Sequence, residues 1–192
     1  MQLRRYYDVQ EWLVLVYKLP PEPSRYRAAV WRRIKSLGAI YLQNGVCVLP
    51  YGRDTERQFR QLRKEIEDCG GESFLIKGTL LVGEQNLIEL FNAARDEEYA
   101  EIIDRCEDFF KEIEMETESR HFTYAELEEN EEDLAKLEKW MKKVIERDFF
   151  QASLAEKTKE LLQECRTRLD EFADRVFVCE DSMHKKPECM ES

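Results

Sequence analysis

The sequence predicts an α+β protein in which a ferredoxin-like split βαβ unit is followed by a long antiparallel helical hairpin or a three-helix bundle. Residues 11–83 alternate short apolar runs with helical patterns in the order β-α-β(β)-α-β, whereas the residues after 83 show helical spacing only. A chain of 192 residues can hold two small units. We therefore expect a ferredoxin-like unit over 11–83, a helical region over 84–178 and a disordered tail over 179–192.

The first unit is expected to begin with a buried strand and a basic helix. Residues 12–19 form an almost continuous apolar run that two prolines close, as is typical of a central strand. Ser24 is the expected N-cap of a helix that runs to about Leu37 and ends at Gly38. The inward side of this helix is expected to consist of Val30, Trp31, Ile34 and Leu37.

Two short strands and a second helix come next. Residues 40–50 carry apolar side chains on either side of Asn44-Gly45, a dipeptide that favours a hairpin turn or a bulge. Asp54 is the expected N-cap of a helix that a glycine pair ends, and residues 74–82 are the expected last strand. The inward residues of this second helix are expected to be Phe59, Leu62 and Ile66.

The second half of the chain is predicted to form long helices. The first of them has helical apolar spacing, and a break near Asp96 is one option. The segments Thr123-Tyr-Ala-Glu126 and Ser153-Leu-Ala-Glu156 are capping boxes that predict two further helix starts. The apolar positions of the helix after Thr123 follow heptad steps, with Asn130 in one of the seam positions. The short connection at 148–152 predicts that the last two helices are antiparallel neighbours.

Charge is distributed unevenly along the chain, whose formal net charge is −11. Up to Gly83 there are 14 basic and 9 acidic residues, and beyond it there are 16 basic and 32 acidic residues. An anionic partner is therefore expected to meet the first half, while the second half is a scaffold or faces protein. The acid-rich segment 96–138 is most simply a solvated helix exterior, with a protein-binding or DNA-mimicking surface as the alternative.

The lack of long apolar runs and of paired cysteines predicts where the protein is located and that its thiols are reduced. No apolar run approaches 18 residues, and the first ten residues have no secretory apolar stretch, so we expect a cytoplasmic protein with no membrane contact. The six cysteines show no paired C-x-x-C spacing, which favours reduced thiols. An isolated cysteine on an apolar stripe, such as Cys106 or Cys165, is expected to be a small buried hydrophobe and not a redox centre.

Known catalytic and metal-binding patterns match the sequence poorly. Glu118 and His121 have the spacing of di-iron bundles, but such sites need the motif twice and two more glutamates, so His121 is expected in an exposed loop. Cys179, His184 and Cys189 match no standard zinc spacing. No nucleophile elbow and no glycine-rich phosphate loop occur. We expect no catalytic residue, no metal site and no cofactor.

The strongest candidate site is a set of basic side chains on the two helices of the first unit. These helices share one sheet face in a ferredoxin-like unit, so their outer sides form one surface that suits phosphates or tetrahedral oxyanions. The alternative is a solvated helix face that Glu56, Glu65, Glu67 and Asp68 balance. The candidates for binding nucleic acid or an oxyanion are Arg25, Arg27, Arg32, Arg33, Lys35, Arg53, Arg57 and Arg60, and Arg63 and Lys64 extend the second helix.

Several sequence blocks resemble one known family. The segments 12–50 and 57–81 contain Val-Tyr-Lys-Leu-Pro, Val-Trp-Arg-Arg and Gly-Gly-Glu in that order, and they resemble the N-terminal domain of ChrB, the chromate-resistance regulatory protein. The blocks 96–103 and 137–177 extend the resemblance more weakly. It implies a non-enzymatic regulator that binds promoter DNA and responds to chromate. We expect it to act as a homodimer, with the long helices as a spacer or dimerising arm.

A more distant resemblance leads to the alternatives. The strand that ends in Tyr17, the Arg-rich helix and Leu-Gln-x-x-Val at 42–46 are similar to the ferredoxin-like CRISPR-associated nuclease-fold protein and to the middle domain of PaaX-type repressors. In the CRISPR-associated family a metal-ligating Asp follows this Tyr, whereas here the residue is Lys18. Hard cations need oxygen ligands, so Lys18 disfavours a divalent-metal-dependent nuclease. A protein-binding scaffold or sensor module is the other alternative.

Overall fold

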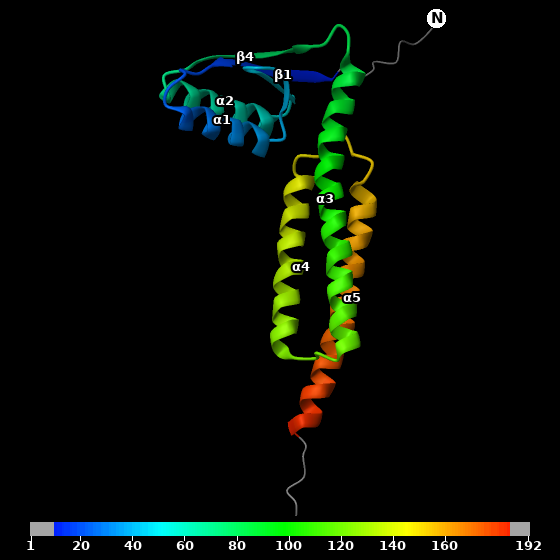
Figure 1. Cartoon of the computed structure of the whole chain (residues 1–192). Helices are drawn as coiled ribbons and strands as arrows, with labels where there is room; N and C mark the ends of the chain where they lie inside the picture. The colour runs from blue at the N-terminus through cyan, green and yellow to red at the C-terminus, as the bar shows by residue number, and fades with distance from the viewer. Residues whose placement is uncertain (1–9, 185–192) are drawn as a thin grey trace, which may run out of the picture. The chain divides into compact units, whose positions relative to one another are not determined.

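The computed structural model describes residues 10–184, which divide into two units (Figure 1). The first unit contains the described residues up to Ala93 together with Arg147–Phe150, and the second contains Ala94–Glu146 and the residues from Gln151 onward. The division falls inside the long helix α3 (Glu84–Ser119). None of the helices described within 10–184 has the length and apolar character that crossing a lipid bilayer requires.

The first unit is a four-stranded antiparallel sheet with two helices on one face (Figure 1). The strand order is β2-β3-β1-β4, the arrangement of a ferredoxin-like split βαβ unit, and the α+β prediction is confirmed. The elements are β1 (Glu11–Lys18), α1 (Ser24–Ser36), β2 (Ile40–Gln43), β3 (Val46–Pro50), α2 (Arg53–Asp68) and β4 (Glu72–Thr79).

The core of this unit follows from the alternation of side chains along β1. Leu13 and Leu15 pair in register with Leu49 and Cys47 of β3, and all four side chains are buried. On the opposite sheet face, Trp12 stacks on Phe91 of α3 at 5.8 Å between ring centroids. The helix residues that complete the core are Val30, Ile34, Leu37, Phe59, Leu62 and Ile66, as the sequence predicts.

Two details of α1 correct the sequence prediction. Ser24 is the first helical residue and not the N-cap, which is Pro23 and makes no side-chain capping bond. Trp31 was expected to point inward, but 52% of it is exposed. Val30, Ile34 and Leu37 are spaced by four and three residues and already fill the inward stripe, so the neighbouring indole lies outside it.

The start of α2 and both ends of β4 also differ from the sequence prediction. Asp54 lies in the first turn of α2, because the N-cap is Gly52 and the Thr55 hydroxyl donates to the Pro50 carbonyl oxygen at 2.8 Å. Strand β4 covers Glu72–Thr79, so the predicted strand at 74–82 begins earlier and ends earlier than expected.

The second unit is a three-helix bundle of α3, α4 (Tyr124–Ile145) and α5 (Ala155–His184), which decides between the two predicted arrangements (Figure 1). Helix α3 runs without interruption through Asp96, where the sequence allowed a break. The buried core takes residues from all three helices: Tyr99, Ile102, Cys106, Phe109 and Ile113 from α3, Leu127, Leu134, Leu137, Met141 and Val144 from α4, and Leu162, Cys165, Leu169, Phe172 and Val176 from α5.

The helix start predicted at Tyr124 is confirmed, with Thr123 as the N-cap. The Thr123 side chain accepts a hydrogen bond from the backbone N–H of Glu126 at 3.3 Å. Ser153 does not cap α5, because the Asp96 carboxylate of α3 accepts from the Leu154 N–H at 2.8 Å and from the Ser153 hydroxyl at 2.9 Å. A tertiary contact thus replaces the local cap.

Helix α5 continues beyond the predicted limit at residue 178 and ends at His184. Residues 179–184, which were expected to belong to a disordered tail, are therefore helical. The physical reason is that α5 contains no glycine or proline to end it earlier. The rest of the predicted tail, 185–192, lies outside the described residues.

Candidate nucleic-acid interface

Helix α1 carries five basic residues and no acidic residue. Four of the five side chains are exposed and Arg33 is half-buried. None of the five forms an ion pair with any residue of the described range 10–184. The Arg25 guanidinium lies 5.2 Å from the ring centroid of Tyr26, and Arg32 Nε donates to the Ala28 carbonyl oxygen at 3.3 Å. The five residues Arg25, Arg27, Arg32, Arg33 and Lys35 are called the α1 basic face below.

Helix α2 differs because it carries five basic and five acidic residues. Its arginines pair within the helix: Arg57 with Asp54 at 2.9 Å, Arg60 with Glu56 at 2.6 Å, and Arg63 with Glu67 at 2.8 Å. Such exposed pairs add at most about 1 kcal/mol of stability each, but they leave α2 without net charge. Arg53 is exposed at the start of α2 and has no ion pair with the described residues. The structure therefore separates a cationic α1 from a balanced α2, which the sequence prediction treated as one surface.

The residues that the sequence analysis considered for metal binding do not lie together in the structure. His121 is exposed in the loop after α3, while Glu118 lies in the last turn of that helix, so they share no helix face. Lys18 is exposed at the end of β1, opposite Glu72. His184 ends α5, and Cys189 lies outside the described residues. Within 10–184, no group of three or more His, Cys, Asp or Glu residues is arranged to hold a metal ion.

Two cysteines meet in the bundle core, which their sequence positions do not reveal. Cys106 of α3 and Cys165 of α5 are both fully buried, as predicted, and the two thiols interact with each other. This contact and burial raise the pKa of the Cys165 thiol. In the first unit, burial raises the pKa of Cys47 to about 12. Because the thiolate is the reactive form, Cys47 and Cys165 are poor nucleophiles near neutral pH.

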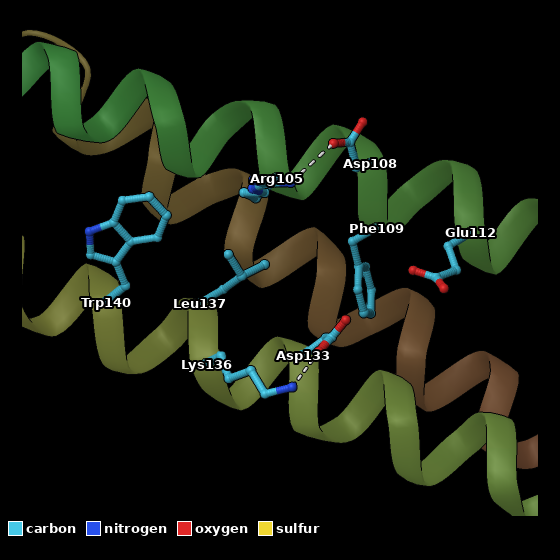
Figure 2. A pocket seen from close by; sticks show the side chains of 8 residues that line it. All are labelled: Arg105, Asp108, Phe109, Glu112, Asp133, Lys136, Leu137 and Trp140. Carbon is cyan, nitrogen blue, oxygen red and sulfur yellow. Dashed lines mark hydrogen bonds and ion pairs between the residues drawn. The ribbon is translucent and has the colours of Figure 1, made fainter.

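A shallow groove of about 360 Å³ lies between α3 and α4 (Figure 2). Trp140, Leu137 and Phe109 form its apolar part. Its two basic side chains are paired with acids, Lys136 with Asp133 at 2.7 Å and Arg105 with Asp108 at 3.9 Å. The groove belongs to the acid-rich segment, and its paired charges give it no preference for an anion.

The buried carboxylate of Glu116 connects α3 to Asn130 of α4. Asn130 Nδ2 donates to Glu116 Oε2 and to the Glu126 carbonyl oxygen, both at 2.9 Å. Burial raises the pKa of Glu116 to about 7 from its ordinary value of 4.5, and the carboxylates of Glu126 and Glu112 add to the shift. Between pH 4.5 and about pH 7, Glu116 is therefore protonated in the folded bundle and ionised in the unfolded chain.

This linkage predicts a pH-dependent stability. The pKa of Glu116 is higher in the folded bundle than in the unfolded chain, so protonation of Glu116 stabilises the fold. This stabilisation is fully present below about pH 4.5 and is lost as the pH rises through about 7. The free energy of unfolding should fall by about 1–3 kcal/mol between pH 5 and pH 8. Glu116→Gln keeps an acceptor for Asn130 and should remove this dependence in urea unfolding at the two pH values. Glu118→Gln, an exposed substitution on the same helix, is the control; an unchanged slope in Glu116→Gln would refute the assignment.

One comparison with known proteins found a match. The family model described as protein ChrB, N-terminal, matches residues 27–183, which is well over half of the chain. The match includes all of the α1 basic face except Arg25. No curated protein and no solved structure matches the chain. The chain therefore belongs to the ChrB N-terminal family, which is associated with chromate resistance.

Proposed function

We propose that this ChrB-family protein is a regulatory protein without catalytic activity that binds promoter DNA through the α1 basic face. The single observation that carries the proposal is that five basic side chains share one 13-residue helix with no acid and no ion pair to the described residues. Each phosphate that such a side chain neutralises releases counterions and adds affinity. A cytoplasmic homodimer belongs to this proposal.

The heptad seam of α4 bears on how such a dimer would form. Its apolar residues, from Leu127 to Val144, are buried against α3 and α5 within the same chain. The apolar seam of α4 therefore packs against helices of the same chain and is not available to a second copy. A dimer contact has to use another surface.

The test is a mobility shift with DNA from upstream of the protein's own gene. Arg32→Glu with Arg33→Glu should abolish the shifted complex, because two charges of the α1 basic face are reversed. Arg57→Glu with Arg60→Glu is the matched control on α2, where acids already balance the arginines, and it should retain the complex. Binding by the α1 variant at the wild-type level would remove the proposal.

Chromate is a second anion for the same face, since arginine forks suit tetrahedral oxyanions. We propose that it acts as the signal that modulates DNA binding. Repeating the mobility shift with chromate, and with sulfate as an oxyanion of the same shape and charge, tests this. A change in affinity with chromate alone is expected, while equal effects of both ions would indicate only ionic competition.

A protein-binding module is the alternative that a specific observation favours. Phe74 and Ile76 of β4 are 66% and 52% exposed on the sheet face opposite α1 and α2, and Leu81 and Val82 after β4 are also exposed. Exposed apolar patches mark contact surfaces more often than chance. A stable complex that persists in high salt and tolerates Arg32→Glu with Arg33→Glu would favour this alternative.

A further inference from the structure

A hollow of about 580 Å³ lies beside α1, at the end of the sheet near the β2–β3 turn. Its volume lies within the range of about 300–1,000 Å³ that is usual for small-molecule sites. Three of its seven lining residues are aromatic, one is cationic and none is acidic. The lining residues are Tyr17, Leu19, Arg27, Trp31, Tyr41, Asn44 and Gly45.

The aromatic side chains of the hollow offer ring surface to a ligand. Trp31 is 52% exposed, although indoles are usually well buried. It lies one helical turn after Arg27, so the indole and the guanidinium stand on the same side of α1. A planar ring can stack on Trp31 while an anionic group attached to that ring reaches Arg27.

The tyrosine pair adds a hydrogen-bond donor. The Tyr17 and Tyr41 hydroxyl oxygens are 3.0 Å apart, so one donates to the other and the acceptor keeps its own proton for a ligand. Burial raises the pKa of both tyrosines, which keeps both hydroxyls protonated near neutral pH. With the Asn44 amide, the hollow thus presents donors and a cation and no carboxylate.

The backbone holds this side of the hollow in place. The Tyr17 N–H donates to the Gly45 carbonyl oxygen at 2.7 Å, and Gly45 has a φ of +76°. A Cβ at Gly45 would lie only 2.5 Å from the Tyr17 carbonyl oxygen. The close approach of the two backbones fixes the turn against β1, so the site is formed before a ligand arrives.

The geometry points to a nucleotide site in this hollow, in which a base stacks on Trp31 and its phosphate binds Arg27. The ligand chemistry is a nucleoside phosphate, either a free mononucleotide or a residue of an unpaired nucleic-acid strand. This inference goes beyond duplex binding by the α1 basic face, because Arg32 and Arg33 do not line the hollow and duplex DNA keeps its bases stacked inside the helix.

Tryptophan fluorescence tests the site in the full chain. Trp140→Phe removes the half-buried indole of the second unit, and Trp12 is 1% exposed, so the signal that a ligand can quench comes from Trp31. The probes are adenosine 5′-monophosphate, adenosine without phosphate, and an eight-residue oligothymidylate. Saturable quenching by the monophosphate indicates a free nucleotide, and quenching by the oligonucleotide alone indicates an unpaired strand.

Calorimetry with the same probes then examines variants of the hollow. Trp31→Ala should weaken binding by about 5- to 150-fold, and Trp31→Phe should retain most of it. Arg27→Gln should remove the preference for the monophosphate over adenosine. Arg32→Glu with Arg33→Glu should still bind the nucleotide, which separates this site from the proposed duplex interface. The inference is overturned if neither the monophosphate nor the oligonucleotide quenches Trp31 up to about 5 mM, or if Trp31→Ala binds as tightly as the unaltered protein.

Discussion

Replacing Trp12 with alanine is expected to destabilise the first unit by about 3–5 kcal/mol. Trp12 is 1% exposed and is the largest of the fully buried side chains. Its ring lies 5.8 Å from that of Phe91 and 5.7 Å from that of Phe150, and its Nε1 donates to Glu84 Oε1 at 3.1 Å. The substitution opens a cavity and removes the contacts that hold the start of α3 and Phe150 on the sheet.

Urea unfolding followed by circular dichroism measures this loss. Trp31→Ala is the matched control, since it removes the same side chain from a position that is 52% exposed and should cost far less. Trp12→Phe should lie between the two, because it keeps an aromatic ring but loses the bond to Glu84. If Trp12→Ala and Trp31→Ala cost the same, the assignment of Trp12 to the core is wrong.

Gly45→Ala is expected to have the second largest effect on stability, about 2–4 kcal/mol. Its φ of +76° disfavours a side chain, and the added Cβ would lie 2.5 Å from the Tyr17 carbonyl oxygen. The turn has to move away from β1, which breaks the hydrogen bond from Tyr17 N–H to Gly45. The nucleotide site proposed beside this turn should also be lost.

Gly70→Ala separates the two causes. Gly70 has almost the same φ, +75°, but a Cβ there meets no atom within 4 Å. It should therefore show only the conformational cost of about 1–2 kcal/mol. Thermal unfolding of the two variants side by side gives the difference, and equal losses would mean that the approach of Gly45 to Tyr17 contributes nothing.

The elements of this fold were largely predictable because apolar periodicity reports which side of a strand or helix is buried. The inward stripe of α2 is an example, since Phe59, Leu62 and Ile66 are all buried as predicted. The helix starts were less predictable, because a cap is chosen among competing partners in space. Asp96 bonds to Leu154, 58 residues away, and no local pattern around Ser153 signals that contact. Trp31 was assigned inward by its apolar character, although its position on the helix lies off the buried stripe.

The candidate interface was predictable in composition but not in its division between the two helices. The sequence did contain one usable signal, because Arg57 and Arg60 lie three and four residues after Asp54 and Glu56, the spacing of helical ion pairs. The hollow beside α1 had no such signal. It needs β1, α1 and the β2–β3 turn to meet, and only the folded chain brings Tyr17, Trp31 and Tyr41 together.

The most direct test of the central claim, that α1 and not α2 meets the phosphates, is the salt dependence of DNA affinity. For the unaltered protein, the slope of log K against log salt concentration should be about −3 to −4 per protomer, because each of the four exposed side chains of the α1 basic face can neutralise one phosphate. Arg32→Gln should reduce its magnitude by about 1, while Arg57→Gln should leave it unchanged. A slope near zero, or an equal reduction by Arg57→Gln, would contradict the claim.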